Sequence, residues 1–459
     1  MLELLERQER LTVNQWKLIS AVILGGALGS LASFFSGFAL GSASISQHLA
    51  YVQSQLIHQS GGVGMVLGAI FWGWMADRVG RRKAFIATLL NVSLASGIMA
   101  MTPEQGGLIF LTVCFLFASF GASGLFVAFL PLVQEFVPAS KRGWISGLVV
   151  AIISLGISAA SLPGARLALH IGWRVLFAVC LFPALVTLLI RAWVPESPRW
   201  LIRNGLLEDA RRSVAWALRV DPDEIDLPAT LPKMPHTPWY DLIKHWRSVA
   251  ITCVISVSQM AGVASALWGG LFFSILKITG TTSAYLMLGL VLAGLPGQFV
   301  MSYLSDAIGR RKSGMLCGFG AALSLALAGY CYDAFFGAVS VLWLLMAVAS
   351  FFSVGSMAIV RPYTAEVWPM GLRARGMGLA QAVGGLGGLL APRGLELIIG
   401  APSFASPQAT PASVSSAMPF LAAWSALAGL VFWLFAIETK GRSIEEIDAV
   451  LARPHAAAD

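Results

Sequence analysis

The sequence predicts an all-α membrane protein with twelve transmembrane helices arranged as two six-helix bundles, and three observations carry this prediction. Of the 459 residues, 57% are hydrophobic and only 12% are charged, about half the usual share of charge for a soluble domain. Long apolar runs alternate with short clusters of charge, the pattern expected of membrane helices and their loops. The two halves of the chain also repeat the same charged motifs. This composition excludes most soluble enzymes, disordered proteins and nucleic-acid binders.

Twelve apolar runs approach the roughly 20 residues that a transmembrane helix needs. In the first half they cover 18–42, 62–77, 83–101, 108–133, 143–165 and 173–194. In the second half they cover 249–275, 284–305, 313–332, 337–362, 376–400 and 418–437. We therefore expect a first bundle over 1–194, a polar segment over 195–248 and a second bundle over 249–459. The polar segment joins an amphipathic helical pattern to a stretch rich in proline and aspartate, which predicts a helical linker.

The positions of lysine and arginine predict the orientation in the membrane. Of the 31 such residues, 27 fall on one side; the exceptions are Arg166, Arg174, Lys277 and Arg393. The positive-inside rule then places both termini and the linker in the cytoplasm. The N-terminal segment has no small-residue cleavage site after the first apolar run, so we expect that run to be a retained helix in a bacterial inner membrane.

We expect no cofactor and no enzymatic activity. The five cysteines lie singly in apolar runs, without ligand spacing or a disulfide framework, and the six histidines fall in predicted loops. The sequence has no nucleophile–base constellation, metal-ligand cluster or nucleotide-binding loop. The expected partners are a small-molecule solute and the lipid bilayer, with no nucleic acid, and we expect a monomer.

The internal repeat points to transport. GWMADRVGRRK at 73–83 recurs as SYLSDAIGRRK at 302–312. A glutamate followed by proline and arginine occurs at 135–142 and again at 366–375. A repeated six-helix unit suits a transporter whose two halves tilt around a solute site at their interface.

These motifs resemble those of the major facilitator superfamily over nearly the whole chain. DRVGRRK and DAIGRRK resemble its signature loop between the second and third helices of each half. PESPRWL at 195–201 and ETKGRSIEEI at 438–447 resemble the marks of its sugar-porter-related branch. The resemblance implies the major facilitator fold and solute transport by alternating access, since the family works in this way.

The resemblance also implies a cytoplasmic gate that is closed in the outward-open state. Carried onto this chain, it pairs Asp77 with Arg142, and Asp306 with Arg373 or Arg375. The alternative is that these charges only fix topology and loop shape. The gating candidates are Asp77, Arg78, Gly80, Arg81, Glu135, Arg142, Glu196, Arg199, Asp306, Gly309, Arg310, Glu366, Arg373, Arg375 and Glu438.

Proton coupling stays open, because the first span departs from the family pattern. Ser36 and Ala39 stand where proton-coupled relatives usually carry a carboxylate, and Phe117 stands where the fourth helix often carries an arginine. The carboxylate and the arginine are absent together. This is physically consistent, since either charge alone would be a costly unpaired ion in the membrane. Glu396 with Arg393 is the remaining candidate for coupling or for contact with a charged solute; the alternative is a self-satisfied pair near the outer interface.

The expected solute is an organic or aromatic acid or a similar metabolite of low polarity. A sugar needs many donors and acceptors, because each buried polar group without a partner costs about 1–3 kcal/mol, and Gln259 is the only amide side chain in the seventh span. The predicted lining is Phe35, Phe38, Ser123, Ser154, Gln259, Trp268, Ser353 and Gln381; each aromatic could equally fill the core or face lipid. Arg361 is interpreted as a structural or gating partner of Glu366, in preference to the alternative that it binds substrate. The sequence thus predicts a secondary active transporter, with an uncoupled facilitator, a sugar transporter and a non-transporting solute sensor as alternatives.

Overall fold

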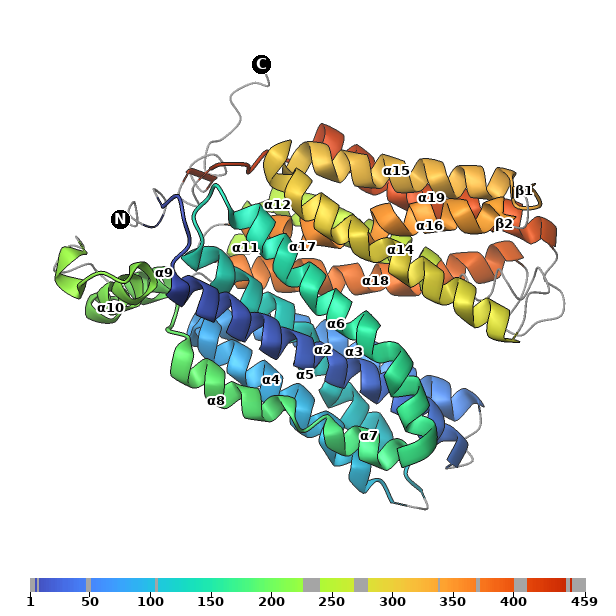
Figure 1. The fold of residues 1–459 in the computed structure, drawn as a ribbon, viewed down its shortest axis with the longest axis horizontal. Helices are drawn as coiled ribbons and strands as arrows, with labels where there is room; N and C mark the ends of the chain where they lie inside the picture. The colour runs from blue at the N-terminus through green and yellow to red at the C-terminus, as the bar shows by residue number, and fades with distance from the viewer. Residues whose placement is uncertain are drawn as a thin grey trace.

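The structure is a computed structural model, and it describes residues 5, 8–46, 51–103, 106–225, 240–267, 280–336, 339–368, 372–399, 411–442 and 446–447. These residues are almost entirely helical (Figure 1). Within them the only strands are β1 (Phe335–Phe336) and β2 (Val339–Ser340), which pair antiparallel in a small hairpin. The all-α prediction is confirmed.

The six spans predicted in the first half all coincide with helices. These are α2 (Val13–Ser46), α3 (Tyr51–Val79), α4 (Arg81–Ile98), α5 (Leu108–Phe136), α6 (Arg142–Ile171), α7 (Trp173–Val179) and α8 (Pro183–Trp193). A 3-10 turn, η1 (Met99–Met101), extends α4. The sixth span is divided between α7 and α8, because Pro183 has no N–H with which to continue the hydrogen-bond pattern of α7.

The six spans predicted in the second half also coincide with helices. These are α12 (Trp246–Leu267), α14 (Gly280–Ala307), α15 (Arg310–Tyr330), α16 (Val341–Gly355), α17 (Met357–Glu366), α18 (Arg373–Ile399) and α19 (Pro411–Leu434). The tenth span is divided between α16 and α17, which meet at Ser356. Between the halves lie α9 (Pro198–Arg203), α10 (Leu207–Leu218), the turn η2 (Pro222–Glu224) and α11 (Asp241–Lys244).

Eight of the described helical segments are apolar and long enough to cross a membrane. The other four predicted spans correspond to α3, α6, α12 and α18, which contain 22 to 30 residues. At 1.5 Å per residue, even the shortest of them reaches across about 30 Å of hydrocarbon.

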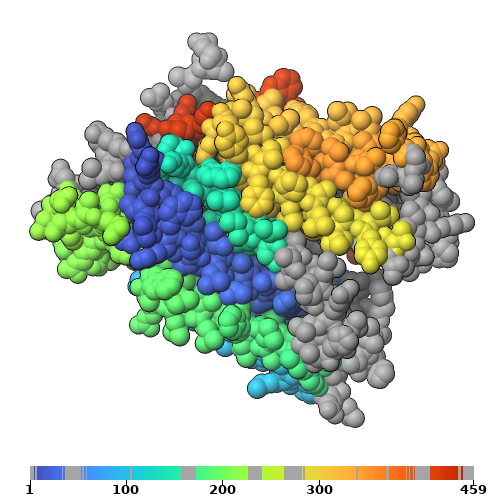
Figure 2. All heavy atoms as spheres, in the orientation of Figure 1, coloured from blue at the N-terminus to red at the C-terminus, as the bar shows by residue number. Residues whose placement is uncertain are grey.

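The two halves of the chain meet mainly along two pairs of helices, α3 with α18 and α6 with α14 (Figure 1). In the space-filling view the side chains of α6 lie directly against those of α14 (Figure 2). Glycine permits this close approach. A Cβ at Gly378 would lie 2.2 Å from the Ala69 carbonyl oxygen, and one at Gly147 would lie 2.4 Å from Ser302 Oγ.

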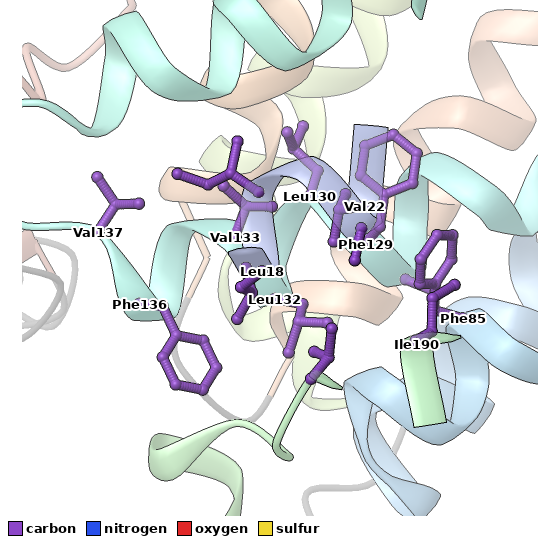
Figure 3. Close-up of a cluster of buried hydrophobic side chains, with 14 of the residues drawn as sticks. Leu18, Val22, Phe85, Phe129, Leu130, Leu132, Val133, Phe136, Val137 and Ile190 are labelled. Atoms are coloured by element: carbon purple, nitrogen blue, oxygen red, sulfur yellow. The ribbon is translucent and has the colours of Figure 1, made fainter. Parts of the chain in front are cut away.

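The first half packs around an apolar cluster that links four of its helices. Leu18 of α2, Phe85 of α4, Phe129 and Leu130 of α5, and Ile190 of α8 are all fully buried in this cluster (Figure 3). Burial of this kind holds the helices of one half together, so that the polar contacts between the halves can change separately.

Candidate functional site

Four acids lie at one end of the helices, at the close of α3, α5, α14 and α17, and we call this the charged end. Three of them are buried, and the acid of α14, Asp306, is half-buried. In the first half, Arg81 connects two of them. Its guanidinium lies 3.1 Å from Asp77 Oδ1 and 3.4 Å from Glu135 Oε1, and all three side chains are almost completely buried. One arginine thereby balances part of the charge of two carboxylates, which a buried site of this kind requires.

The second half repeats the arrangement with Arg310. This guanidinium lies 2.5 Å from Asp306 Oδ1 and 3.2 Å from Glu366 Oε1. Because Asp306 and Arg310 occupy the same places in their motif as Asp77 and Arg81, the sequence repeat is also a repeat of the site.

A hydroxyl completes each half of the network. Ser197 donates a hydrogen bond to Glu135 Oε2, and Thr439 donates one to Glu366 Oε2. Sequence reasoning missed both residues, although each directly follows a predicted gating glutamate, Glu196 or Glu438. Without these donors the second carboxylate oxygen would be buried and unsatisfied.

The carboxylates of Glu196 and Glu438 cap the N-termini of helices. Glu196 Oε1 accepts hydrogen bonds from the backbone N–H groups of Arg82 (3.0 Å) and Ser197 (3.1 Å) at the start of α4 and α9. Glu438 accepts from the N–H groups of Arg310 (2.9 Å) and Arg311 (3.2 Å) at the start of α15. These contacts satisfy N–H groups that have no partner inside their helix.

Both the backbone conformation and the lack of space for a Cβ require glycine in each signature loop. Gly80 has φ +113° and Gly309 has φ +98°, a backbone conformation that side chains disfavour. A Cβ would also lie 2.4 Å from Glu196 Oε2 at Gly80, and 2.2 Å from Glu438 Oε2 at Gly309. The glycines therefore make room for the capping carboxylates.

Burial also changes the proton affinity of groups at the charged end. Burial raises the pKa of the Glu196 carboxyl above its ordinary value, and the N–H donors of Arg82 and Ser197 oppose this effect. Burial lowers the pKa of the Arg203 guanidinium in α9, and the nearby carboxylate of Asp77 opposes that.

The two aspartates of the network make equivalent contacts across the interface between the halves. Asp77 Oδ2 accepts a hydrogen bond of 3.1 Å from the N–H of Arg375, and Asp77 Oδ1 accepts one of 3.4 Å from the N–H of Ala374. In the same way, Asp306 Oδ2 accepts a hydrogen bond of 2.6 Å from the N–H of Trp144. Each aspartate of one half thus meets the N-terminus of a helix of the other half, α18 or α6, where free N–H groups and the helix dipole favour a negative charge.

These contacts correct the pairs expected from the sequence, which lay within one half. Asp77 was expected to pair with Arg142, but its described contacts go to Arg81 and to the start of α18, where Arg375 Nε is 3.9 Å away. Asp306 was expected to pair with Arg373 or Arg375, but it contacts Arg310 and the N–H of Trp144 at the start of α6. The physical reason is the packing of α3 on α18 and of α14 on α6, which places each carboxylate at the opposite helix N-terminus.

The remaining gating candidates surround this network, with one exception. Arg373 Nη1 lies 3.7 Å from Glu135 Oε1 across the interface, and Arg199 Nη1 donates to the Glu135 carbonyl oxygen at 3.1 Å. Arg142 donates to the carbonyl oxygens of Gln134 and Arg442. Arg78 is exposed and stacks over Trp74, outside the network.

Three of the residues predicted to line a solute site lie where the halves meet. Gln381 of α18 donates a 2.9 Å hydrogen bond to the carbonyl oxygen of Ser123 in α5. Ser154 of α6 accepts a 3.2 Å hydrogen bond from Gln298 Nε2 of α14, a residue that sequence reasoning missed. These polar contacts lie between the halves, where the repeat predicts the solute site.

Two other predicted lining residues lie inside the second half. Gln259 and Ser353 border a cavity of about 20 Å³ among α12, α15, α16 and α19, together with Ser425 and Cys317. A cavity needs a volume of about 10–15 Å³ to hold one water molecule. This cavity therefore suits one water and no organic solute.

Of the other predicted residues, the structure places two. Phe35 is half-buried in α2, and Arg393 is exposed on α18. Trp268 and the side chains of Phe38 and Glu396 lie outside the described part of the structure.

Sequence reasoning also misjudged Arg361 of α17. Its guanidinium stacks over the ring of Phe126 in α5, with Cζ 3.7 Å from the ring centroid. Glu366, its expected partner, contacts Arg310 and Thr439. Residues five apart on a helix point about 140° away from each other, so these two side chains cannot meet.

Comparison with known proteins identifies relatives along nearly the whole chain. The model of a family described as "Sugar (and other) transporter" matches residues 20–451. The chain is 29% identical over 417 residues to the niacin transporter NiaP of Acinetobacter baylyi, covering 85% of this chain and 89% of that protein. It is 26% identical over 389 residues to the putative niacin/nicotinamide transporter NiaP of Bacillus subtilis, covering 83% and 88%.

A solved structure has the same fold. The major facilitator superfamily proton:xylose symporter XylE, bound to 6-bromo-6-deoxy-D-glucose, matches with a TM-score of 0.77 at 19% identity, covering 95% of this chain and 99% of that one. At this identity the likeness shows the fold alone.

Proposed function

Because the chain belongs to the sugar (and other) transporter family of the major facilitator superfamily, it is a membrane transporter of a solute and not an enzyme, and we propose that it moves a small organic acid by alternating access. The charged end is the gate in this proposal. It opens when the two aspartates leave the helix N-termini of the opposite half.

The two crossing contacts carry the proposal. Asp77 binds the start of α18 and Asp306 binds the start of α6, so breaking both would free α3 from α18 and α14 from α6 at this end. Within each half the ion pairs of Arg81 and Arg310 can persist, because they join helices of the same half. The halves can thereby separate without leaving a buried acid wholly uncompensated.

The size of these contacts suits a switch. A hydrogen bond to a charged group contributes about 1.5–3 kcal/mol, so two equivalent links supply about 3–6 kcal/mol. Transporters need two packings that differ by only a few kcal/mol. Contacts of this size can hold the gate closed and still break during each cycle.

The polar groups between the halves favour a solute of low polarity. Gln381 and Gln298 contact Ser123 and Ser154 across the interface, and few other amides reach it among the described residues. The curated relatives named as niacin transporters support an aromatic acid as the class of solute.

We place the charged end in the cytoplasm of a bacterial cell, with the protein acting as a monomer in the inner membrane. The linker helices α9 and α10 lie at this end (Figure 1), and most of the lysine and arginine residues flank the same end.

An uncoupled facilitator is the second candidate. In the membrane helices, the acids whose side chains the structure describes all lie at the charged end. The first span has Ser36 where a proton-binding carboxylate would be expected, and its hydroxyl donates a hydrogen bond to the Ala32 carbonyl oxygen. Glu396 of α18 is the proposed coupling group if transport is driven by protons.

The proposal is tested with purified protein in two steps. A library of organic acids, amides and sugars is screened for thermal stabilisation, and the best ligand is then assayed for uptake into liposomes with and without a pH gradient. We expect uptake of an organic acid. Binding without any translocation would mean that the protein is a solute sensor, and a preference for sugars would overturn the solute class.

A further inference from the structure

Arg361 is a cation between the two halves that has no acidic partner in the part of the chain that the structure describes. No carboxylate among the described residues lies within 4 Å of it, and its Nη1 is buried without a hydrogen-bond partner there. The one described contact of its guanidinium is the face of Phe126. The nearest acid on the same helix, Glu366, is occupied by Arg310 and Thr439.

The direction of the side chain separates Arg361 from the charged end. Side chains on a helix point toward its N-terminus, and α17 approaches the charged end with its C-terminal residue, Glu366. The guanidinium therefore points toward the middle of the membrane. Phe126 agrees with this depth, since it precedes Glu135 on α5 by nine residues, or about 13 Å of helix.

The surroundings place Arg361 where the halves meet. Its helix packs against α5 and α6 of the first half and α14 and α18 of the second. The carbonyl oxygen of the next residue, Pro362, accepts a hydrogen bond from Gln134 of the first half. One turn earlier on α17, Met357 Sδ lies 3.9 Å from Gln298 Nε2. Arg361 is half-buried, so part of this residue remains accessible.

The internal repeat has no cation at the corresponding position of the first half. Aligning Glu135 with Glu366 also aligns Pro131 with Pro362, and both prolines lie inside their helices. The residue that then corresponds to Arg361 is Leu130, which is fully buried in the apolar cluster of the first half (Figure 3). An unpaired cation at membrane depth is costly, and such residues mark functional sites.

We propose that Arg361 binds the carboxylate of the transported solute and that Phe126 forms an aromatic wall beside it. A guanidinium binds a carboxylate through two parallel N–H donors, and an aromatic ring packs well against a planar apolar body. The structure therefore assigns the solute to the planar monocarboxylates. This inference rests on the proposed transport function and names the residue that recognises the solute.

The test compares each acid with its uncharged counterpart of the same shape. The probes are nicotinate against nicotinamide and benzoate against benzamide. Binding is measured by ligand-induced thermal shift and by titration on purified wild type, Arg361→Gln, Arg361→Lys and Phe126→Leu. Arg174→Gln is the matched control, since Arg174 also stacks on an aromatic ring (4.4 Å from Trp173) but lies at the opposite end.

The wild type should bind the acids and not the amides. Arg361→Gln should weaken binding of the acids by roughly 10- to 100-fold, Arg361→Lys should recover part of the loss, and Arg174→Gln should bind as the wild type does. Without ligand, Arg361→Gln should be at least as stable to heat as the wild type, because it removes an unpaired cation. A purely structural arginine would give the opposite result, a loss of stability without ligand.

Failure of the inference and failure of transport give different results. If Arg361→Gln binds and transports the acids as well as the wild type, or if the wild type prefers the amides, Arg361 is not the carboxylate site although the protein transports. If wild-type liposomes take up no probe and no member of the wider library, the transport function is wrong and the inference falls with it.

Discussion

Replacing Asp77 with asparagine should shift the protein toward the state that is open at the charged end. The substitution keeps the size of the side chain and removes its charge. Asp77 contacts Arg81 within its own half and the N–H groups of Ala374 and Arg375 across the interface. In the proposed gate only the contacts across the interface change when this end opens, so the shift would report on them.

The size of the effect follows from these contacts. A hydrogen bond to a charged group contributes about 1.5–3 kcal/mol and a neutral one about 0.5–1.5 kcal/mol. A negative charge at a helix N-terminus adds about 0.3–1 kcal/mol. Losing the charge should therefore cost the closed state about 2 kcal/mol, which changes the ratio of closed to open molecules roughly 30-fold.

Spin labels at Lys83 and Lys312 can measure this ratio. Both side chains are exposed, and they occupy equivalent places at the start of α4 and α15. In Asp77→Asn the distribution of label distances should move to longer values, and uptake should fall far more than expression does. The control is Glu208→Gln, an exposed acid in α10 whose only described ion pair, to Arg212, is also exposed. An unchanged distance distribution together with unchanged uptake would refute the assignment of Asp77 to a gate.

Three further predictions test other parts of the network. Gly80→Ala should destabilise the protein by about 1–3 kcal/mol, because φ is +113° and Glu196 occupies the space of a Cβ. Gly62→Ala is the control and should not destabilise the protein, since a Cβ at Gly62 would meet open space. Equal melting temperatures of the two variants would contradict the role given to Gly80. Ser197→Ala should lower thermal stability by about 1–3 kcal/mol, since Glu135 Oε2 loses its donor. Thr439→Val should have the same effect, since Glu366 Oε2 loses its donor. No loss of stability in either variant would show that these hydroxyls are dispensable. If Glu396 carries a coupling proton, Glu396→Gln should abolish protonophore-sensitive accumulation and leave exchange intact, whereas persistent accumulation would exclude it.

The helices could be predicted because their signal is local. Each apolar run in the sequence corresponds to a helix, and a proline accounts for the break in the sixth span. The ends were less accurate. The second span was expected to begin at residue 62, but α3 begins at Tyr51. A hydropathy pattern ends where the apolar residues end, whereas the backbone hydrogen bonds of a helix continue through polar residues.

The partners of the charged residues could not be predicted in the same way. The motifs identified Asp77 and Asp306 as members of one network, but the donors they meet are backbone N–H groups of Arg375 and Trp144. A backbone N–H leaves no signature in a sequence. Which helix start comes to lie beside which carboxylate depends on how the two halves pack, and this is a property of the tertiary structure alone.

The repeat divides the polar residues into two classes that should behave differently. Asp77, Arg81 and Glu135 have counterparts in Asp306, Arg310 and Glu366, in the same geometry. If the residues that both halves share serve the proposed motion of the halves, their variants should change the rate of transport of every solute to a similar degree.

Arg361 belongs to the other class, since its counterpart is the buried Leu130. A charge present in only one half cannot serve a symmetric motion, but it can distinguish one solute from another. Its variants should therefore change the ratio of acid to amide binding while leaving the label distances between Lys83 and Lys312 unchanged in the absence of solute. An altered distance distribution in Arg361→Gln without solute would instead make Arg361 part of the gate.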